Sequence, residues 1–514
     1  MFYRQKISPS SKYQTDESKL TGKAVHVIIP VDISELKEAV RVNNYKGNPI
    51  TVSAMRTGVC GGSVAMEGDV LSLERLSGVT GVGRDERGYF LRVLPCTTIG
   101  EIDRVLRDRD FSKLQDVTEG AAESLRSEPT SYFYPVDPTE LGGSIGGNIA
   151  CNSSGPRTYR YGPTRDWVRR LMVVLPEGQS IDVTRGDVIA DGKRFCIPAG
   201  RAFYSFDIPS YEYNDSVKNA TGPMFREGMD LVDLFIGSEG IFGVIAEADI
   251  YVIPRRPLIS NILFFPDDSE CLGVIRDIRA DDTIEPEFLE YMDGRSLDLI
   301  RGVMSEDPVL IKVPSIPEDA GSALFFDVQD NGDVDAVYDR IRSIAEAHGA
   351  SFGTSWCGHE EQDRSRMREL RHAIPRTIFE YVASLKGKMP AIHKMGTDMS
   401  VPDDKADEMM SYYSEQLGRA GLDYVIFGHI GNNHPHVEII LKSMDDFAKA
   451  KEVYARFAEK AVELGGSPSA EHGIGKIKVD YMLMMYGPEG VDGIRRIKNV
   501  LDPKNILCRG NLIG

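Results

Sequence analysis

The first half of the chain alternates short apolar runs with glycine-rich turns. The runs are rich in β-branched residues, and their length predicts strands at residues 26–32, 50–55, 91–96, 171–176 and 244–254. Between the strands, apolar side chains at helical spacing predict helices over 32–44 and 98–111. Asp32 is a suitable N-cap with Glu35 three residues later, so the first helix is expected to begin there.

The pattern changes near Pro254–Leu258, where longer amphipathic segments replace the glycine-rich turns. Residues 334–349 and 445–466 are expected to be helices that end at glycine, and residues 322–329 and 424–430 are expected to be strands. The polar stretch 107–130 is predicted to be a surface insertion. These patterns indicate an α+β protein in which one domain covers residues 20–256 and a second covers 257–490.

Composition narrows the class of protein. A chain of 514 residues is too long for one core. The net charge of −18 disfavours binding to nucleic acid or to anionic membranes, and no apolar run is long enough for a transmembrane segment. The seven cysteines are dispersed, which argues against iron–sulfur clusters and structural zinc. Dispersed cysteines and a polar N-terminus without an apolar signal segment lead us to expect a cytoplasmic location.

Three glycine-rich loops in the first half are candidates for cofactor binding. They cover Arg56–Ala65, Tyr134–Val168 and Asp233–Ala248. Glycine lets backbone N–H groups approach a phosphate closely, although any one of these loops could equally be an ordinary turn. None has the spacing of a dinucleotide fingerprint or a P-loop. Their repetition favours a polyphosphate-bearing cofactor bound outside those two folds.

Histidines gather in "FGHIGNNHPHVEI", residues 427–439. His429 and His436 are seven residues apart, which would place them on opposite faces of one strand. The intervening "GNN" breaks the strand, so both rings could turn to one point, and Glu471 in "AEHGIG" offers a carboxylate. Two histidines and a carboxylate suit zinc, manganese or iron(II). The alternative is that these are ordinary hydrogen-bonded or surface histidines.

Several motifs occur in the order of a known family. They are "PVDPTELGGSIGGNIACNSSGPRTYRYG", "KNATGPMFREGMDLVDLFIGSEGIFGVI", "GTDMSVP", "FGHIG…H" and "AEHGIG". With them the chain, over residues 20–514, resembles the FAD-linked oxidases of the vanillyl-alcohol-oxidase (PCMH-type) flavin fold, in the branch of D-lactate and D-2-hydroxyacid dehydrogenases. The resemblance implies a PCMH-type FAD-binding domain, a cap domain with an antiparallel sheet, and a C-terminal segment, 491–514, that returns to the first domain.

By the same resemblance, FAD would be bound without a covalent link. The first loop would hold its pyrophosphate through Thr57, Gly58, Gly61, Gly62 and Ser63. The flavin and phosphates would be lined by Pro135, Asp137, Ser144, Gly146, Gly147, Ser154, Gly155 and Gly162. The adenosine half would lie near Glu239, Gly243 and Ile245. The chain departs from the family at Ser53-Ala54 and Cys508-Arg509, where Arg-Gly and Asn-Pro are usual.

The resemblance also assigns the chemistry. His429, His436 and Glu471 match metal ligands, His472 matches the catalytic base, and Arg371 matches the arginine that binds the substrate carboxylate. The family's "HxGDGNxH" is "HIGNNHPH" here, so Asn432 replaces the acid and His434 is additional. For Arg371 the alternative is an exposed helix face. Lys394 is a second candidate, although its spacing to Asp398 differs from that in the hydroxyglutarate branch.

Three functions compete at this point. The first is oxidation of a D-2-hydroxy acid, with D-lactate favoured, by hydride transfer to FAD and onward electron transfer to oxygen, a quinone, a cytochrome, an electron-transfer flavoprotein or a partner subunit. The second is ether-bond formation of the alkyl-glycerone-phosphate-synthase type, whose members also carry a histidine-rich stretch. The third is a FAD-binding subunit of a larger redox complex. The sequence leaves the acceptor and the oligomeric state open; a homodimer is one option.

Overall fold

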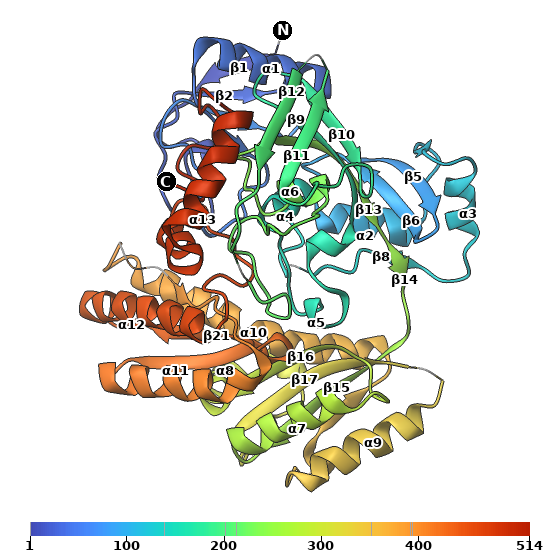
Figure 1. Cartoon of the computed structure of the whole chain (residues 1–514). Helices are drawn as coiled ribbons and strands as arrows, with labels where there is room; N and C mark the ends of the chain where they lie inside the picture. The colour runs from blue at the N-terminus through green and yellow to red at the C-terminus, as the bar shows by residue number, and fades with distance from the viewer. Residues whose placement is uncertain are drawn as a thin grey trace.

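The computed structural model describes residues 2–137, 139–200, 202–211, 213–330, 332–350, 352–390, 392 and 394–514. Two bodies lie one above the other (Figure 1), with the first half of the chain in one and most of the second half in the other. The helix α13 (Val479–Leu501) lies beside the first body, although it is near the C-terminus. The protein mixes helices with largely antiparallel sheets, so the predicted α+β class is confirmed.

A small sheet begins the first body. Its strand order is β1 (Tyr3–Lys6), β2 (His26–Ile29), β4 (Asp69–Ser72) and β3 (Ile50–Ser53), and the last three run parallel. The helix α1 (Ile33–Lys46) packs on it through Leu36 and Val40. The Asp32 carboxylate accepts the backbone N–H of Glu35, so the predicted N-cap is present. Near the C-terminus, Leu507 forms a parallel bridge with Ile50 at the open edge of β3.

A second, six-stranded sheet forms the centre of the first body. Its order is β10 (Ser180–Thr184), β9 (Val168–Val174), β13 (Val244–Tyr251), β6 (Gly88–Val93), β5 (Val79–Asp85) and β7 (Gln115–Asp116). Around it lie α2 (Ile99–Asp108), α3 (Ala121–Ser127), α4 (Ile145–Cys151), α5 (Thr158–Tyr161), α6 (Leu231–Phe235) and the hairpin β11 (Arg194–Ala199)–β12 (Ala202–Asp207). Two short strands, β8 (Tyr132–Phe133) and β14 (Ile253–Pro254), form a separate antiparallel pair in this body.

The stretch 107–130 is more than a surface insertion. Its charged residues are mostly exposed, but β7 extends the central sheet by pairing with β5. Phe111, Ala121 and Leu125 are buried in the core of the first body. Leu114, Val117 and Ala122 are partly buried against the same core. Ala121 and Leu125 are one helical turn apart and share a face of α3, so they anchor that helix together.

The second body is built on one antiparallel sheet of seven strands. Their order is β18 (Trp356–Gly358), β15 (Leu258–Phe265), β17 (Ser322–Gln329), β16 (Pro286–Asp293), β20 (Asp423–His429), β21 (His434–Ile440) and β19 (Met395–Gly396). One face packs against α7 (Asp268–Ala280), α9 (Val334–Ala347), α11 (Ala406–Ala420) and α12 (Met444–Glu463). The other packs against α8 (Gly294–Val303) and α10 (Glu361–Leu385). With both faces covered, β16 and β17 are buried along their whole length.

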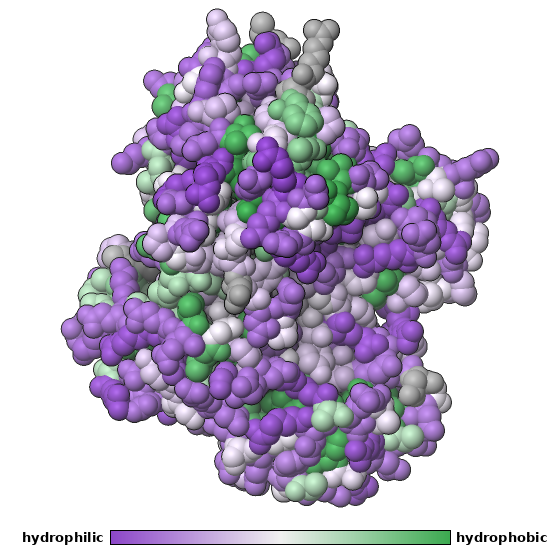
Figure 2. Space-filling view, viewed as in Figure 1, coloured by the Kyte–Doolittle hydropathy of each residue, from purple (hydrophilic) through white to green (hydrophobic). Residues whose placement is uncertain are grey.

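The boundary between the two sheets falls where the sequence pattern changes, since β14 ends at Pro254 and β15 begins at Leu258. The exact domain limits remain predictions. The visible surface is mainly hydrophilic, with small scattered apolar areas (Figure 2). No helix in the described ranges combines the length and the apolarity that crossing a bilayer requires.

Candidate active site

The three histidines lie together at the tip of the β20–β21 hairpin. His429 ends β20 and His434 begins β21, and the two are direct partners across the hairpin. A short 3-10 turn, Ile430–Asn432, connects them, and Asn433 takes the left-handed conformation at φ 49° that closes the turn. Side chains of directly paired residues share a face of a sheet, and so do residues two apart on one strand. His429, His434 and His436 therefore point the same way.

The rings are in mutual contact. Their centroids are 5.3 Å apart for His429 and His434, 5.1 Å for His429 and His436, and 4.6 Å for His434 and His436. Glu471 reaches the group from the loop before α13, with Oε2 3.4 Å from His429 Nε2 and Oε1 3.7 Å from His436 Nε2. One ligand atom from each of the four residues lies within 4.8 Å of the others. The structure thus brings together the three predicted ligands and adds His434.

Two of the rings are oriented by partners outside the cluster. The Nδ1 of His429 is 2.5 Å from Oε1 of Glu290 on β16, and the Nδ1 of His436 is 2.9 Å from the carbonyl oxygen of Thr397. Both partners accept hydrogen bonds, so each Nδ1 donates and each Nε2 is turned toward Glu471. A buried outer carboxylate or carbonyl of this kind is typical of metal-binding histidines.

Asp398 holds the turn that carries Glu471 and His472. Its carboxylate accepts the backbone N–H groups of Glu471 at 3.1 Å and His472 at 3.2 Å, and it binds Lys478 Nζ at 2.7 Å. Asp398 is fully buried. Burial opposes its ionisation, but His472 and Lys478 outweigh that effect and hold the pKa of Asp398 well below its usual value. The negative charge therefore stays at the base of the turn at neutral pH.

The electrostatics favour the protonation states that bind metals at His434, His436 and Glu471, and favour the protonated ring at His429. Burial, with the nearby Lys218 cation, lowers the pKa of His434 to about 4, and burial with the neighbouring rings lowers the pKa of His436. Burial opposes the ionisation of Glu471, but Lys218 and His429 outweigh it and lower its pKa well below the usual value. For His429 the attraction of Glu290 outweighs burial and raises the pKa. Neutral imidazole and ionised carboxylate are the forms that ligate divalent ions.

His472 lies at the most accessible side of the cluster. Its side chain is 32% exposed, compared with 6% for His429 and 14% for His436. Its ring stacks on His436 at a centroid distance of 5.9 Å, and its Nε2 is 3.6 Å from Oε1 of Glu471. Burial lowers its pKa and Lys478 adds to this effect, although Asp398 opposes it. A neutral ring at an accessible edge has the position that a proton acceptor needs.

Arg371 is part of the same network. Its side chain, on α10, is 12% exposed, and its Nε donates to Oε2 of Glu290 at 3.2 Å. The alternative of a solvated helix face is therefore wrong, because the guanidinium is turned into the protein. Lys394, the weaker candidate, is more exposed and pairs with Oε1 of Glu438 at 2.6 Å.

Buried polar atoms without partners accumulate around the glycine loops. Among the described residues, Ser53 Oγ, Tyr134 OH, Asn148 Nδ2 and Ser154 Oγ have no hydrogen-bond partner in the protein. A Cβ added to Gly58 would meet nothing within 4 Å. Buried donors and acceptors normally find partners, so these atoms indicate that a polar ligand completes this region. The residues present therefore fit the flavin nucleotide that the sequence predicts.

Several predicted cofactor residues also have structural roles. A Cβ on Gly146 would lie 2.7 Å from the carbonyl oxygen of Pro95, and one on Gly243 would lie 2.4 Å from Cγ1 of Val173. The carboxylate of Glu239 accepts two backbone N–H groups of the "AEHGIG" turn. Ser144 caps α4 by accepting the N–H of Gly147, Ser63 donates a hydrogen bond to Asp16, and Gly155 donates one to Thr158. Asp137 forms an ion pair with Arg157, and Gly162 ends α5. Pro135 and Ile245 are buried. Their contacts with FAD remain predictions.

The first loop lies against both of the regions it is expected to join. A Cβ on Gly143 would lie 3.7 Å from the hydroxyl of Thr57, and one on Gly62 would lie 3.5 Å from Glu239. The loop also accepts two N–H groups, of Lys476 and Ile477, at the carbonyl oxygen of Cys60. On its other side, a Cβ added to Gly61 would lie 3.0 Å from Cδ2 of Leu20. The three glycine-rich segments are thus neighbours in space.

Sequence reasoning missed four residues of this site: Lys218, Glu290, Asp398 and His434 as a cluster member. Lys218 lies in the motif that begins "KNATG" and Asp398 lies in "GTDMSVP", so the order of the motifs included both residues without giving them a role. Glu290 carried a recognisable signal, since it is a carboxylate in the middle of a strand whose residues are all buried. Buried carboxylates are rarely tolerated without a partner.

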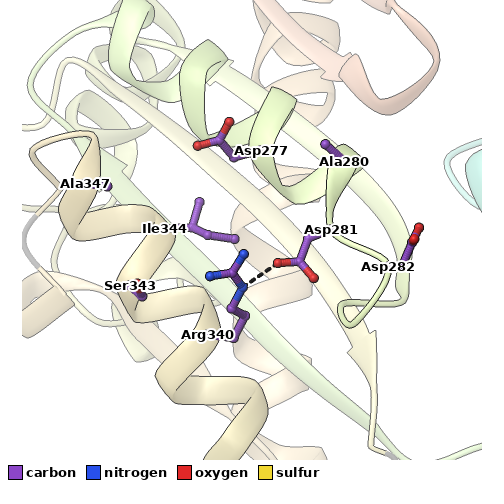
Figure 3. A pocket seen from close by; sticks show the side chains of 8 residues that line it. All are labelled: Asp277, Ala280, Asp281, Asp282, Arg340, Ser343, Ile344 and Ala347. Atoms are coloured by element: carbon purple, nitrogen blue, oxygen red, sulfur yellow. Dashed lines mark hydrogen bonds and ion pairs between the residues drawn. The ribbon is translucent and has the colours of Figure 1, made fainter.

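A separate hollow of about 450 Å³ lies between α7 and α9 (Figure 3). Asp277, Asp281 and Asp282 line it, and Arg340, its one lining cation, is paired with Asp281. Three carboxylates against one guanidinium would repel an organic acid. The hollow contains none of the predicted site residues.

Comparison with known families identifies the fold. Residues 259–512 match the family of FAD linked oxidases, C-terminal domain, and residues 124–184 match the FAD binding domain family. Together the two matches cover more than half of the chain. The chain belongs to the FAD-linked oxidases. The FAD-binding domain that the resemblance implied is therefore confirmed, and this FAD-linked oxidase is an FAD-dependent oxidoreductase by family.

Individual relatives extend over nearly the whole chain. The sequence is 26% identical to the glycolate oxidase subunit GlcD of Bacillus subtilis, over 95% of this chain and 88% of that protein. It is 25% identical to a D-lactate dehydrogenase of Anaerostipes hadrus, over 97% and 91%. It is 27% identical to a D-2-hydroxyglutarate dehydrogenase of Xanthomonas citri pv. viticola, over 96% and 90%.

A solved alkyldihydroxyacetonephosphate synthase shares the fold of this FAD-linked oxidase. The TM-score is 0.61 at 13% identity, and the match covers 95% of this chain and 76% of that one. At this identity the likeness concerns the fold alone. The arrangement of a flavin-binding body and an antiparallel cap is therefore shared by proteins that carry different reaction names.

Proposed function

We propose that this FAD-linked oxidase oxidises a D-2-hydroxy acid, with D-lactate favoured, to the 2-oxo acid. The observation that carries the proposal is the meeting of His429, His436 and Glu471, within reach of one ion, next to the accessible ring of His472. The relatives named for D-lactate and D-2-hydroxyglutarate support the substrate class. In this proposal the electrons pass on to a non-nicotinamide acceptor.

The substrate carboxylate and hydroxyl have separate partners in this proposal. Arg371 binds the carboxylate through its guanidinium, which presents several donors in one plane. Glu290 keeps Arg371 and His429 in register, because its two oxygens face one each. The hydroxyl lies toward His472, whose neutral ring takes the hydroxyl proton. Asp398 holds the backbone of that residue, so the proton acceptor is in place before substrate arrives.

Two bound groups would supply the remaining chemistry. FAD, when bound, provides the two-electron acceptor for the hydride that leaves Cα. A divalent metal held by His429, His436 and Glu471 would lower the pKa of the substrate hydroxyl as a Lewis acid. The donor set fits such an ion. The ligand atoms lie within 4.8 Å of one another, so small movements would bring each of them to the usual metal–ligand distance of about 2.0–2.2 Å from one shared ion.

Anaerobic mixing tests the proposal. Purified FAD-loaded protein is mixed with D-lactate, L-lactate or D-2-hydroxyglutarate while the flavin absorbance near about 450 nm is followed. Reduction by one D-acid and not by its L-isomer is the expected result. Protein that holds FAD but is reduced by none of these acids refutes the proposal and favours a synthase-type or subunit function.

The identity of the acceptor is a second, separate test. Protein reduced by the D-acid is exposed in turn to oxygen, a soluble quinone, cytochrome c or an electron-transfer flavoprotein, and the rate of flavin reoxidation is measured. Rapid reoxidation by one carrier assigns the acceptor class. Reoxidation by NAD⁺ would contradict the proposed non-nicotinamide route.

A further inference from the structure

The hairpin carries one more imidazole than the three-ligand metal site requires. His434 is fully buried, and its ring is the nearest neighbour of His436 within the cluster. Its ligand atom belongs to the group that lies within 4.8 Å. A buried imidazole costs free energy unless both of its nitrogens interact. The partners of those nitrogens therefore indicate what the ring does.

Lys218 determines the tautomer of His434. The Lys218 ammonium lies 3.2 Å from His434 Nδ1, and an ammonium can only donate. Nδ1 therefore carries the lone pair, and the ring proton is on Nε2. That nitrogen lies 3.2 Å from Oδ1 of Asp398, in a bent contact that is not an aligned hydrogen bond. His434 thus has a carboxylate behind it and a lone pair in front, as a metal ligand does.

All three imidazoles then present lone pairs to the same place. His429 and His436 offer Nε2, because their Nδ1 atoms donate to Glu290 and Thr397, and His434 offers Nδ1. Glu471 supplies the oxygen at the centre of the group. Three imidazole nitrogens and one carboxylate oxygen form a complete donor set for a divalent transition metal.

A cation already stands beside this donor set. Lys218 Nζ lies 2.7 Å from Oε2 of Glu471 and 3.3 Å from the carbonyl oxygen of Gly155, and the side chain is 1% exposed. Lys218 comes from the first body, between β12 and α6, whereas its partners His434 and Glu471 lie in the second half of the chain. A divalent ion bonded to Glu471 and His434 would lie next to this ammonium. Two positive charges at such a short distance repel each other strongly.

We propose that the metal site of this protein has four protein ligands, His429, His434, His436 and Glu471, and that the Lys218 ammonium holds the His434 side until a metal displaces it. The inference rests on the metal site of the proposed function and extends it. A third imidazole shifts the preference from manganese toward zinc or iron(II), since nitrogen ligands suit those ions better. It also leaves fewer positions for substrate.

The test counts imidazoles on the metal. Full-length, FAD-loaded protein without substrate is saturated with Zn²⁺, and X-ray absorption at the zinc edge gives the number of histidine ligands. We expect three for the unmodified protein and two for His434→Asn. Competition with a colour-forming chelator should show the Zn²⁺ Kd rising at least about tenfold in His434→Asn. It should fall at least about tenfold in Lys218→Met, which lacks the competing charge.

His348→Asn is the matched control, because His348 pairs with Asp277 on the surface, outside the cluster. It should change neither the count nor the Kd. If zinc has only two imidazole ligands in the unmodified protein, or if the Kd is unchanged in His434→Asn, then His434 is not a metal ligand. If the Kd is unchanged or higher in Lys218→Met, then the Lys218 ammonium does not compete with the metal.

The count on the unmodified protein decides the question even if a variant fails to fold. The outcome is also separable from that of the proposed function. If zinc has three imidazole ligands but no D-2-hydroxy acid reduces the flavin, the proposed reaction is wrong and the four-ligand site is still supported. Flavin reduction by a D-acid in protein that binds no Zn²⁺ would leave the reaction standing and overturn the site.

Discussion

Replacing Glu290 by glutamine separates orientation of the site from its charge. Glu290 is buried in β16, with Oε1 2.5 Å from His429 Nδ1 and Oε2 3.2 Å from Arg371 Nε. Both partners donate. Glutamine keeps the shape but has one acceptor atom, so one of the two donors must face an amide N–H₂ group.

The number of acceptor atoms that are lost sets the size of the expected effect. One hydrogen bond to a charged group is lost, which costs about 1.5–3 kcal/mol of folding free energy. Outer-sphere partners of metal-binding histidines typically change metal affinity by about 10- to 100-fold, or roughly 1.4–2.7 kcal/mol. We therefore expect Glu290→Gln to weaken Zn²⁺ binding within this range and to raise the KM for D-lactate, because His429 and Arg371 lose the same anchor.

The assay uses FAD-loaded protein, with Zn²⁺ affinity measured by chelator competition and FAD content by absorbance. Glu287→Gln is the matched control, since Glu287 is a buried carboxylate on the same strand that binds Tyr161 and Gln329 instead. It should leave Zn²⁺ affinity unchanged. Glu290 does not orient the site if Glu290→Gln binds Zn²⁺ as tightly as the unmodified protein, or if Glu287→Gln loses as much Zn²⁺ affinity.

Further predictions concern the base, the carboxylate partner, the metal and pH. His472→Ala should keep FAD but lose flavin reduction by D-lactate, and reduction at the unmodified rate would exclude His472 as the base. Arg371→Met should raise the KM roughly 10- to 150-fold, the loss of one charge-assisted contact, while FAD content stays constant. Protein freed of metal by a chelator should lose flavin reduction and regain it with Zn²⁺ or Fe²⁺; full activity without metal would contradict the Lewis-acid role. Burial raises the pKa of Glu239 to about 7, so the folded state binds its proton more tightly than the unfolded chain, whose value is near 4.5. The stability conferred is present below that lower value and is lost as pH rises through 7, so urea unfolding should show up to about 3 kcal/mol less stability at pH 8 than at pH 5, a dependence that Glu239→Gln should lack.

Much of the fold was predictable because local patterns agree with the tertiary structure. The β-branched runs are strands, and the N-cap at Asp32 and the terminal glycines bound helices where they were expected. The stretch 107–130 differs from the prediction because its average polarity conceals several apolar residues that pack on the core. Average polarity describes exposure, whereas a few apolar residues at the right spacing are enough to tie a segment to a core.

The predicted ligands His429, His436 and Glu471 meet because an antiparallel hairpin returns the chain and the loop before α13 reaches its tip. The motif order could indicate which residues take part. It could not indicate that Glu290 and Lys218 contact these ligands, since the two residues come from β16 and from the first body and are far away along the chain. Only packing of the two bodies places the Lys218 ammonium against Glu471.

The sequence by itself therefore determined most of the elements, which depend on short-range periodicity and on side-chain type, and its motif order determined the class of cofactor and the residues proposed for the chemistry. The tertiary structure alone decided which nitrogen of each imidazole faces inward and which charges compensate one another. The physical reason is that tautomers and pKa values are set by neighbours within a few ångströms. In this protein those neighbours are supplied by strands and loops up to about 250 residues apart along the chain, as for Lys218 and Glu471.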